Sequence, residues 1–294
     1  MRSPLRPWLV LTLLSLGLAA RVRSADTSSP TFEYDHGSPL DVKEVGQVKK
    51  FEALVRDVTF DGGSGTVRAY VVAPAAGGTG LAGILYVHWL GEPATTNRTE
   101  FLNEAIALCG QGVVSVCVDT MWAQPKWYEQ RTPENDYADS VRQVIALRRA
   151  LDLLLAQPGV DPKRLAFVGH DIGAMYGCVM GAVDGRPRFY VLMAPTPRMS
   201  DWYLFNVKPA SLDDYKKELT PLDPLAAVPR LAPAPVFYQF AAKDKYVPKP
   251  RPTEFYDATA PRKLMATYDC THDLLLPEVA TDRIAWLERE LGLK

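Results

Sequence analysis

A single aspartate, Asp171, occupies a position in the sequence where a reactive side chain is expected. The segment 165–177, LAFVGHDIGAMYG, passes from an apolar strand pattern directly into a helix pattern. Gly169 and Gly173 lie two residues before and two residues after Asp171, because the strand-to-helix turn is too tight for larger side chains. Such a turn strains residue 171 and points the N-terminus of the next helix at its side chain, which favours anionic species. The pattern is that of a nucleophile elbow with aspartate in the position usually held by serine.

This elbow and its surroundings resemble the α/β-hydrolase superfamily, and the resemblance covers nearly everything after the first 25 residues. Two groups within the superfamily compete. The stretches GVDPKRLAFVGH (159–170) and AAKDKYVP (241–248) are similar to dienelactone hydrolases and their relatives. By contrast, GHD (169–171) is similar to epoxide hydrolases and haloalkane dehalogenases. The elbow residue of dienelactone hydrolases is normally cysteine, so Asp171 departs from that group.

The resemblance implies a catalytic set in the chain order nucleophile, acid, histidine. Asp244 and His272 each follow a predicted strand near the C-terminus, in suitable places for the acid and the histidine. Taken alone, a loop aspartate beside lysines is more often a solvated charge, and a loop histidine is more often structural. Asp269 and Asp273 flank the histidine and are the alternatives for the acid.

The carboxylate of Asp171 favours some reactions over others. Attack on an acyl carbon would give a high-energy anhydride, whereas attack on a saturated carbon gives an ordinary ester. We therefore expect Asp171 to open an epoxide or displace a halide, and His272, oriented by Asp244, to deprotonate the water that hydrolyses the ester. The backbone N–H groups of Ile172 and Trp89 are expected to stabilise the oxyanion of that second step.

The leaving group needs a hydrogen-bond donor, which is a tyrosine hydroxyl for an epoxide oxygen or an indole N–H for a halide. Trp122 and Tyr128 follow a predicted strand, and Trp202 and Tyr203 lie in an insert rich in proline and aromatic residues. Packing in the core or at the rim is the alternative for each of them. Arg198 in the same insert is a candidate for binding a substrate carboxylate, because dienelactone-type substrates carry one.

The rest of the chain predicts the elements that position these side chains. From residue 54 onward, short β-branched runs alternate with helical patterns. Together with the resemblance, this predicts an α/β-hydrolase fold with a mostly parallel eight-stranded sheet and helices on both faces. An antiparallel hairpin is expected at the sheet edge, and the later strands are apolar almost throughout, as strands covered on both faces are. The hairpin is expected at 54–60 and 66–73, the later strands at 84–88, 113–118, 165–169, 189–194, 236–241 and 264–268, and the helices at 98–109, 137–156, 173–183, 253–260 and 277–291.

The predicted domain organisation is simple. Residues 1–25 are expected to be a signal peptide, 26–50 an N-terminal arm and 51–294 a single α/β-hydrolase domain. An insert at 195–235, before the penultimate strand, is expected to form a small lid or rim over the edge of the sheet where ligands bind.

The signal peptide is predicted from Arg2 and Arg6, the apolar run 8–20 and the polar turn at Arg21. The apolar run is too short to span a bilayer comfortably. Cleavage between about residues 20 and 25 then predicts a secreted or periplasmic protein with no stable membrane anchor after signal removal.

The composition is that of an ordinary globular protein, with 47% hydrophobic residues and a formal net charge of −1. The absence of a dense Lys/Arg run excludes nucleic acid and anionic membranes as expected partners and leaves a small-molecule substrate. The cysteines Cys109, Cys117, Cys178 and Cys270 sit in apolar surroundings and predict core residues rather than metal ligands, with a disulfide between the first two left open. No metal or organic cofactor is implied, and the oligomeric state is open.

Three functions are compatible with these observations. The first is a cofactor-independent hydrolase that forms a covalent ester between Asp171 and an epoxide or haloalkane. The second is a dienelactone-hydrolase-like enzyme for carboxylic esters or lactones. The third is a non-catalytic binding protein on a hydrolase fold, although such a protein has no need for Asp244 and His272 in these positions.

Overall fold

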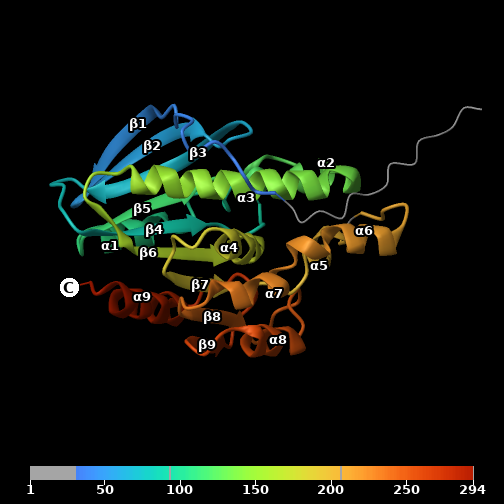
Figure 1. Ribbon diagram of the computed structural model, residues 1–294. Coiled ribbons are helices and arrows are strands. Elements are labelled where there is room, and N and C mark those ends of the chain that lie inside the picture. Colours follow the sequence, from blue (N-terminus) through green and yellow to red (C-terminus); the bar gives the residue numbers. More distant parts are fainter. Residues whose placement is uncertain (1–30, 93, 206, 294) are drawn as a thin grey trace, which may run out of the picture.

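The computed structural model describes residues 31–92, 94–205 and 207–293. Within these ranges the strands form one nine-stranded sheet in the order β1-β2-β3-β5-β4-β6-β7-β8-β9 (Figure 1). The first three strands pair antiparallel, β3 pairs antiparallel with β5, and every pair from β5 to β9 is parallel. The predicted signal peptide lies outside the described residues. No helix in the described ranges is both long and apolar enough to cross a membrane.

The strands and helices have the following bounds. The strands are β1 Lys43–Lys50, β2 Ala53–Asp61, β3 Thr66–Pro74, β4 Leu81–Val87, β5 Val113–Val118, β6 Val160–His170, β7 Phe189–Met193, β8 Val236–Ala241 and β9 Lys263–Tyr268. The α-helices are α1 Leu102–Cys109, α2 Trp127–Gln130, α3 Pro133–Leu155, α4 Ile172–Val183, α5 Met199–Tyr203, α6 Leu212–Leu219, α7 Pro224–Ala227, α8 Pro250–Ala258 and α9 Pro277–Leu291. The 3-10 helices are η1 Met121–Ala123, η2 Thr220–Leu222 and η3 Val228–Leu231.

The central strands are buried on both faces, as their apolar sequences predict. Every residue of β4, β5 and β8 is buried. Helices α3 and α4 pack against each other, with α3 crossing in front of the sheet in Figure 1. On the other face, α9 and α1 are joined by the buried ion pair of Arg283 and Glu104, 2.5 Å apart. The alternation of strands and helices in the sequence therefore gives the expected layered α/β architecture.

The sheet formed by the described residues is mostly parallel, as predicted, and has nine strands, one more than the eight expected. The additional strand is β1, which lies inside the segment 26–50 predicted to be an N-terminal arm. All eight residues of β1 are exposed, so no buried apolar face marks it in the sequence. It is held by backbone pairing with β2 instead. The expectation that β9 is covered on both faces was also wrong, because β9 is an edge strand with only Tyr268 fully buried.

The predicted insert 195–235 corresponds to the segment between β7 and β8, which contains α5, α6, η2, α7 and η3. Helices α5 and α6 extend beyond the sheet on the right side of Figure 1. The more C-terminal part of the segment, α7 and η3, packs on α4. The four cysteines are all buried and free, as expected for core residues.

The segment before β1 is fastened to the domain by a buried arginine of α3. Arg149 donates hydrogen bonds to the backbone carbonyls of Ser38 (3.0 Å), Pro39 (2.7 Å) and Asp61 (3.1 Å). The Asp61 N–H in turn donates to the carbonyl of Leu40 at 2.8 Å. One side chain thus ties the N-terminal segment to the end of β2.

Replacing Arg149 with alanine is expected to loosen this segment without unfolding the domain. Three hydrogen bonds of about 1 kcal/mol each are lost, so the Asp61 amide proton should exchange with solvent about tenfold faster or more. Hydrogen exchange measured by mass spectrometry or NMR tests this. Arg289→Ala is the control, because that side chain is 63% exposed and pairs with its neighbour Glu290. Equal exchange at Asp61 in both variants would contradict the assignment.

Candidate active site

The elbow at Asp171 has the strained geometry that its flanking glycines predict. Asp171 connects β6 to α4 with φ 55° and ψ −120°, a region that costs a non-glycine residue about 1–3 kcal/mol. Its N–H donates to the carbonyl of Met193 at 2.7 Å, and its carbonyl accepts from the N–H of Met175 at 3.0 Å. A Cβ atom at Gly173 would lie 2.6 Å from the carbonyl oxygens of Val87 and His88, so only glycine fits there. The turn fixes a fully buried carboxylate beyond the end of β6.

The three residues predicted to form the catalytic set lie together. His272 Nδ1 is 2.7 Å from Asp244 Oδ2, and His272 Nε2 is 3.3 Å from Asp171 Oδ1. The contact with Asp244 is a hydrogen bond. The contact with Asp171 is within ion-pair distance, but its geometry is not that of a hydrogen bond. Asp244 Oδ1 accepts the backbone N–H groups of Tyr246 (2.8 Å) and Val247 (2.9 Å), which orient the carboxylate.

The two alternative acids lie elsewhere. Asp269 is 81% exposed and pairs with Lys243, while Asp273 accepts a hydrogen bond from Thr271. Neither carboxylate contacts His272 in the described part of the chain, which leaves Asp244 as the acid that orients the ring.

His272 carries a positive charge in this environment. Burial disfavours the cation, but the charge of Asp171 and the contacts with both carboxylates outweigh burial and raise the pKa of His272 to about 10. Burial also opposes the charged form of Asp244, yet the hydrogen bond from His272 holds the pKa of Asp244 below its usual value. The raised pKa of His272 favours its imidazolium form at neutral pH, and an imidazolium donates a proton rather than accepting one.

The loop after β4 supplies a backbone donor to Asp171, but the donor is not the expected one. The N–H of Leu90 donates to Asp171 Oδ2 at 3.2 Å. The N–H of Trp89, predicted for this role, donates instead to Glu100 Oε2 at 2.9 Å. Ile172, the other predicted donor, is the first residue of α4, so its N–H has no acceptor within the helix. The prediction of Trp89 failed because a carboxylate 11 residues away takes its N–H.

A buried contact network that the sequence did not reveal holds the site loops together. His170 Nδ1 is 2.7 Å from Glu100 Oε1, and His170 Nε2 is 3.0 Å from the backbone carbonyl of His272. Glu100 also accepts the N–H of Trp89. The elbow, the loop after β4 and the loop of His272 are thereby linked through two side chains. Only the position of His170 beside Asp171 offered a sequence signal for this role.

Two of the aromatic candidates use their donors for internal contacts. The indole N–H of Trp122 donates to the carbonyl of His88 at 3.3 Å. The hydroxyl of Tyr128 donates to the carbonyl of Trp202 at 2.6 Å. In this conformation both donors are engaged in holding the structure, and neither is free for a leaving group.

Tyr203 and Arg198 are also occupied or distant. The hydroxyl of Tyr203 lies in a buried cluster with the hydroxyls of Ser140 (3.0 Å) and Tyr176 (2.5 Å). Arg198 is 44% exposed, and its guanidinium pairs with Glu254 at 3.9 Å. The structure therefore does not bring either residue to Asp171.

Trp202 is the remaining candidate, and its position differs from that of the others. Its ring centroid is 6.1 Å from that of His272, and the ring stacks on Tyr246 at 5.6 Å. Its indole N–H is buried and has no hydrogen-bond partner among the described residues. A buried donor without an acceptor is costly, so Trp202 is available to a group that enters this site.

In the described ranges no cluster of His, Cys, Asp and Glu side chains could hold a metal ion.

Comparisons with known proteins are consistent with this architecture. No protein-family model matches the chain, and no curated protein matches its sequence. An acetyl xylan esterase from Paenibacillus sp. R4 superposes with TM-score 0.71 at 18% identity, covering 86% of this chain and 89% of that one. The glucuronoyl esterase from Solibacter usitatus gives TM-score 0.62 at 12% identity, covering 88% of each chain. A proposed dienelactone hydrolase from Klebsiella pneumoniae gives 0.58 at 15%, covering 78% and 93%. The chain therefore has the α/β-hydrolase fold, as the sequence predicts.

The elbow tolerates no side chain at position 173. Gly173→Ala is expected to destabilise the protein by about 1–3 kcal/mol, because the new Cβ meets backbone oxygens of β4 and the loop after it that cannot move independently. Urea unfolding measures the change. Gly46→Ala is the matched control, since a Cβ atom there meets nothing within 4 Å. Equal stability of the two variants would show that the turn relaxes.

The charge state of His272 depends on Asp171. In Asp171→Asn the pKa of His272 should fall from about 10 by about 1–3 pH units, because one of its two neighbouring charges is removed. The pKa of His272 is higher in the folded protein than its unfolded value of about 6.5, so protonation of His272 stabilises the fold. This stabilisation is complete below about pH 6.5 and is lost as the pH rises through about 10. The variant should lose this contribution at lower pH. NMR titration of the imidazole and unfolding at several pH values test both points, and an unchanged pKa would contradict the assignment.

Proposed function

We propose that this chain is a hydrolase of carboxylic esters or lactones whose reaction takes place at Asp171, His272 and Asp244. The observation that carries the proposal is the buried imidazole between two carboxylates, one of them on a strained elbow. The ester class is supported by the esterases among the solved structures that share the fold. Fold alone does not determine substrate, so the proposal rests on site and fold together.

The charge state of the site suggests how each residue acts on an ester. Asp171 Oδ1 has no hydrogen-bond partner among the described residues and can accept a proton from water. The resulting hydroxide adds to the acyl carbon, and this avoids the anhydride that direct attack by the carboxylate would form. As the acyl–oxygen bond breaks, the imidazolium of His272 gives its proton to the departing alkoxide. Proton transfer from Asp171 to His272 then restores the starting state.

A second candidate, a hydrolase of epoxides or haloalkanes, is favoured by the contact between Leu90 N–H and Asp171 Oδ2. That contact leaves Oδ1 to attack a saturated carbon and form an ester, with the halide or the epoxide oxygen leaving. Once Asp171 is esterified its charge is gone, so the pKa of His272 falls and His272 can deprotonate water after releasing its proton. The water then attacks the carbonyl carbon of Asp171, and Leu90 N–H stabilises the oxyanion on Oδ2.

Single turnover in ¹⁸O-labelled water distinguishes the two routes. With the protein in excess over substrate, the ester route puts the label directly into the product acid. In the covalent route the label enters the carboxylate of Asp171, and the peptide containing residue 171 becomes about 2 Da heavier because one ¹⁶O is replaced. Mass spectrometry of product and peptide reads both outcomes. The substrates are activated esters, lactones, small epoxides and haloalkanes, tested in parallel.

Two variants sharpen this test. Asp171→Ser should retain or raise ester hydrolysis, because loss of the carboxylate lowers the pKa of His272 and lets it activate the serine. His272→Gln should trap a covalent adduct on Asp171 only if the second candidate is correct. No turnover of any substrate and no adduct, in a folded protein, would leave a non-catalytic binding protein as the function and would falsify both proposals.

A further inference from the structure

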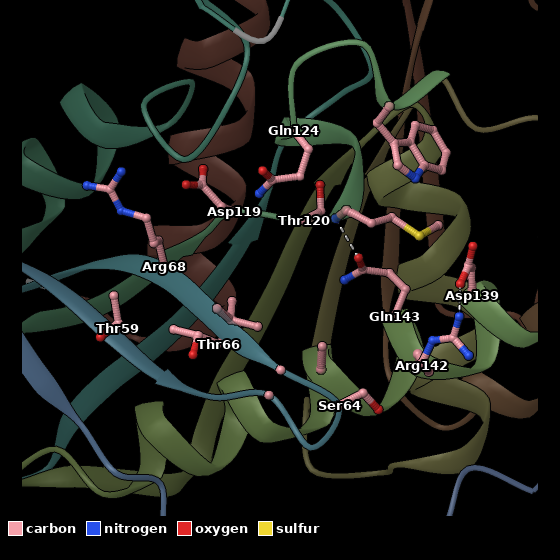
Figure 2. A pocket seen from close by; sticks show the side chains of 16 residues that line it. Thr59, Ser64, Thr66, Arg68, Asp119, Thr120, Gln124, Asp139, Arg142 and Gln143 are labelled. Carbon is pink, nitrogen blue, oxygen red and sulfur yellow. Dashed lines mark hydrogen bonds and ion pairs between the residues drawn. The ribbon is translucent and has the colours of Figure 1, made fainter. Parts of the chain in front are cut away.

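A cavity of about 590 Å³ with both polar and apolar lining residues lies outside the catalytic set. Its walls come from the β2–β3 hairpin, the segment from the end of β5 through η1 to α2, and the N-terminal half of α3 (Figure 2). Asp171, His272 and Asp244 do not line it. The cavity opens at the C-terminal end of β5, at the same sheet edge as the elbow but two strands along the order β5-β4-β6. It is therefore a separate place where a ligand can lie.

The charges around this cavity cancel. Its wall contains two arginines and two aspartates. Arg68 pairs with Asp57 at 3.1 Å, and Asp119 pairs with Arg98 at 2.7 Å. The other two charged lining residues, both on α3, pair with each other. No uncompensated charge in the wall favours an anionic or cationic ligand, so the cavity suits a neutral one.

The uncharged part of the wall is rich in hydrogen-bonding groups. Gln143 says most about the ligand, because this residue is only 5% exposed and half of its amide group is already used. Its amide oxygen accepts the N–H of Met121 at 2.8 Å. The amide nitrogen has no hydrogen bond to any described residue, and Figure 2 shows it directed into the cavity. Hydroxyl and amide side chains of Thr59, Ser64, Thr66 and Gln124 also line the cavity, whereas the Thr120 hydroxyl is paired with His88 Nε2 at 2.9 Å. The wall thus offers several hydrogen-bonding groups.

The same cavity has an apolar side. Trp127, Val67, Met121 and Ala146 line it, and the indole of Trp127 is only partly buried. An indole face suits the C–H face of a ring-shaped ligand. An entirely apolar ligand would leave the Gln143 amide unpaired, and a phosphate or carboxylate ligand would meet no net positive charge.

We propose that this cavity binds a neutral saccharide. The neighbouring hydroxyls of such a ligand pair with the amide, hydroxyl and planar charged groups of the wall. Its apolar ring face packs on Trp127. Arg142 and Asp139, already paired with each other, present a planar donor and a planar acceptor side by side. This binding site is independent of the hydrolytic reaction, since none of the proposed catalytic side chains takes part in it.

Binding is measured by calorimetry on the full chain carrying Asp171→Asn, so that hydrolysis plays no part in the result. The probes are neutral mono- and oligosaccharides of glucose, xylose, mannose and galactose, with glucuronic acid and a sulfated sugar as charged counterparts. At least one neutral sugar should bind, and Gln124→Ala and Arg142→Ala should each weaken its binding by about fivefold, the effect of one lost hydrogen bond of about 1 kcal/mol. Arg289→Ala, on the exposed surface, should bind as the parent does.

Three results would overturn the proposal. One is the absence of binding by every neutral sugar at tens of millimolar, in protein shown to be folded by circular dichroism. Another is tighter binding of the charged counterparts. The third is equal affinity in the two cavity variants and the control. Trp127 is left unchanged in these variants because its ring contacts Trp122 and Tyr203, and its removal could disturb folding.

Discussion

The charged imidazole of His272, held between Asp171 and Asp244, is the interaction on which the arrangement of the site depends. All three side chains are buried, with at most 5% of each exposed. Two buried carboxylates side by side would repel each other strongly without the cation, and the cation would be unstable without them. Removing the cation from such a group costs about 3–5 kcal/mol, because two buried carboxylates are then left uncompensated. The three loops at the ends of β6, β8 and β9 are therefore coupled electrostatically as well as by the sheet.

The sheet register and one buried network make this coupling possible. Parallel pairing of β6 with β7, β7 with β8 and β8 with β9 brings the C-terminal ends of these strands to one edge. His170 then bridges Glu100 and the carbonyl of His272, and Glu100 holds the loop after β4 through Trp89 N–H. Each ring nitrogen of His170 faces an oxygen. These contacts link the donor loop and the histidine loop to the elbow.

The sequence predicted the parts of the site that local chain geometry dictates. Gly173 marks the elbow because backbone oxygens fill the space of a side chain, and fully apolar strands such as β5 mark the buried sheet. What the sequence could not predict depends on tertiary contacts. The exposed strand β1 has no apolar pattern, and Leu90 rather than Trp89 reaches Asp171 because Glu100 takes the other N–H. Only the packed structure separates Trp202 from the other aromatic candidates.

In both proposed routes, the carboxylate at position 171 sets the order of proton transfers. With a hydroxyl at the elbow, the histidine would face one carboxylate and could begin the reaction as a base. With Asp171, the histidine begins as a cation and must act first as an acid or electrostatic partner. In the ester route Asp171 takes the first proton. In the covalent route His272 becomes a base only after the charge of Asp171 has been consumed. An ester hydrolase with aspartate at the elbow would therefore differ from one with a hydroxyl there in its order of proton transfers, even on the same fold.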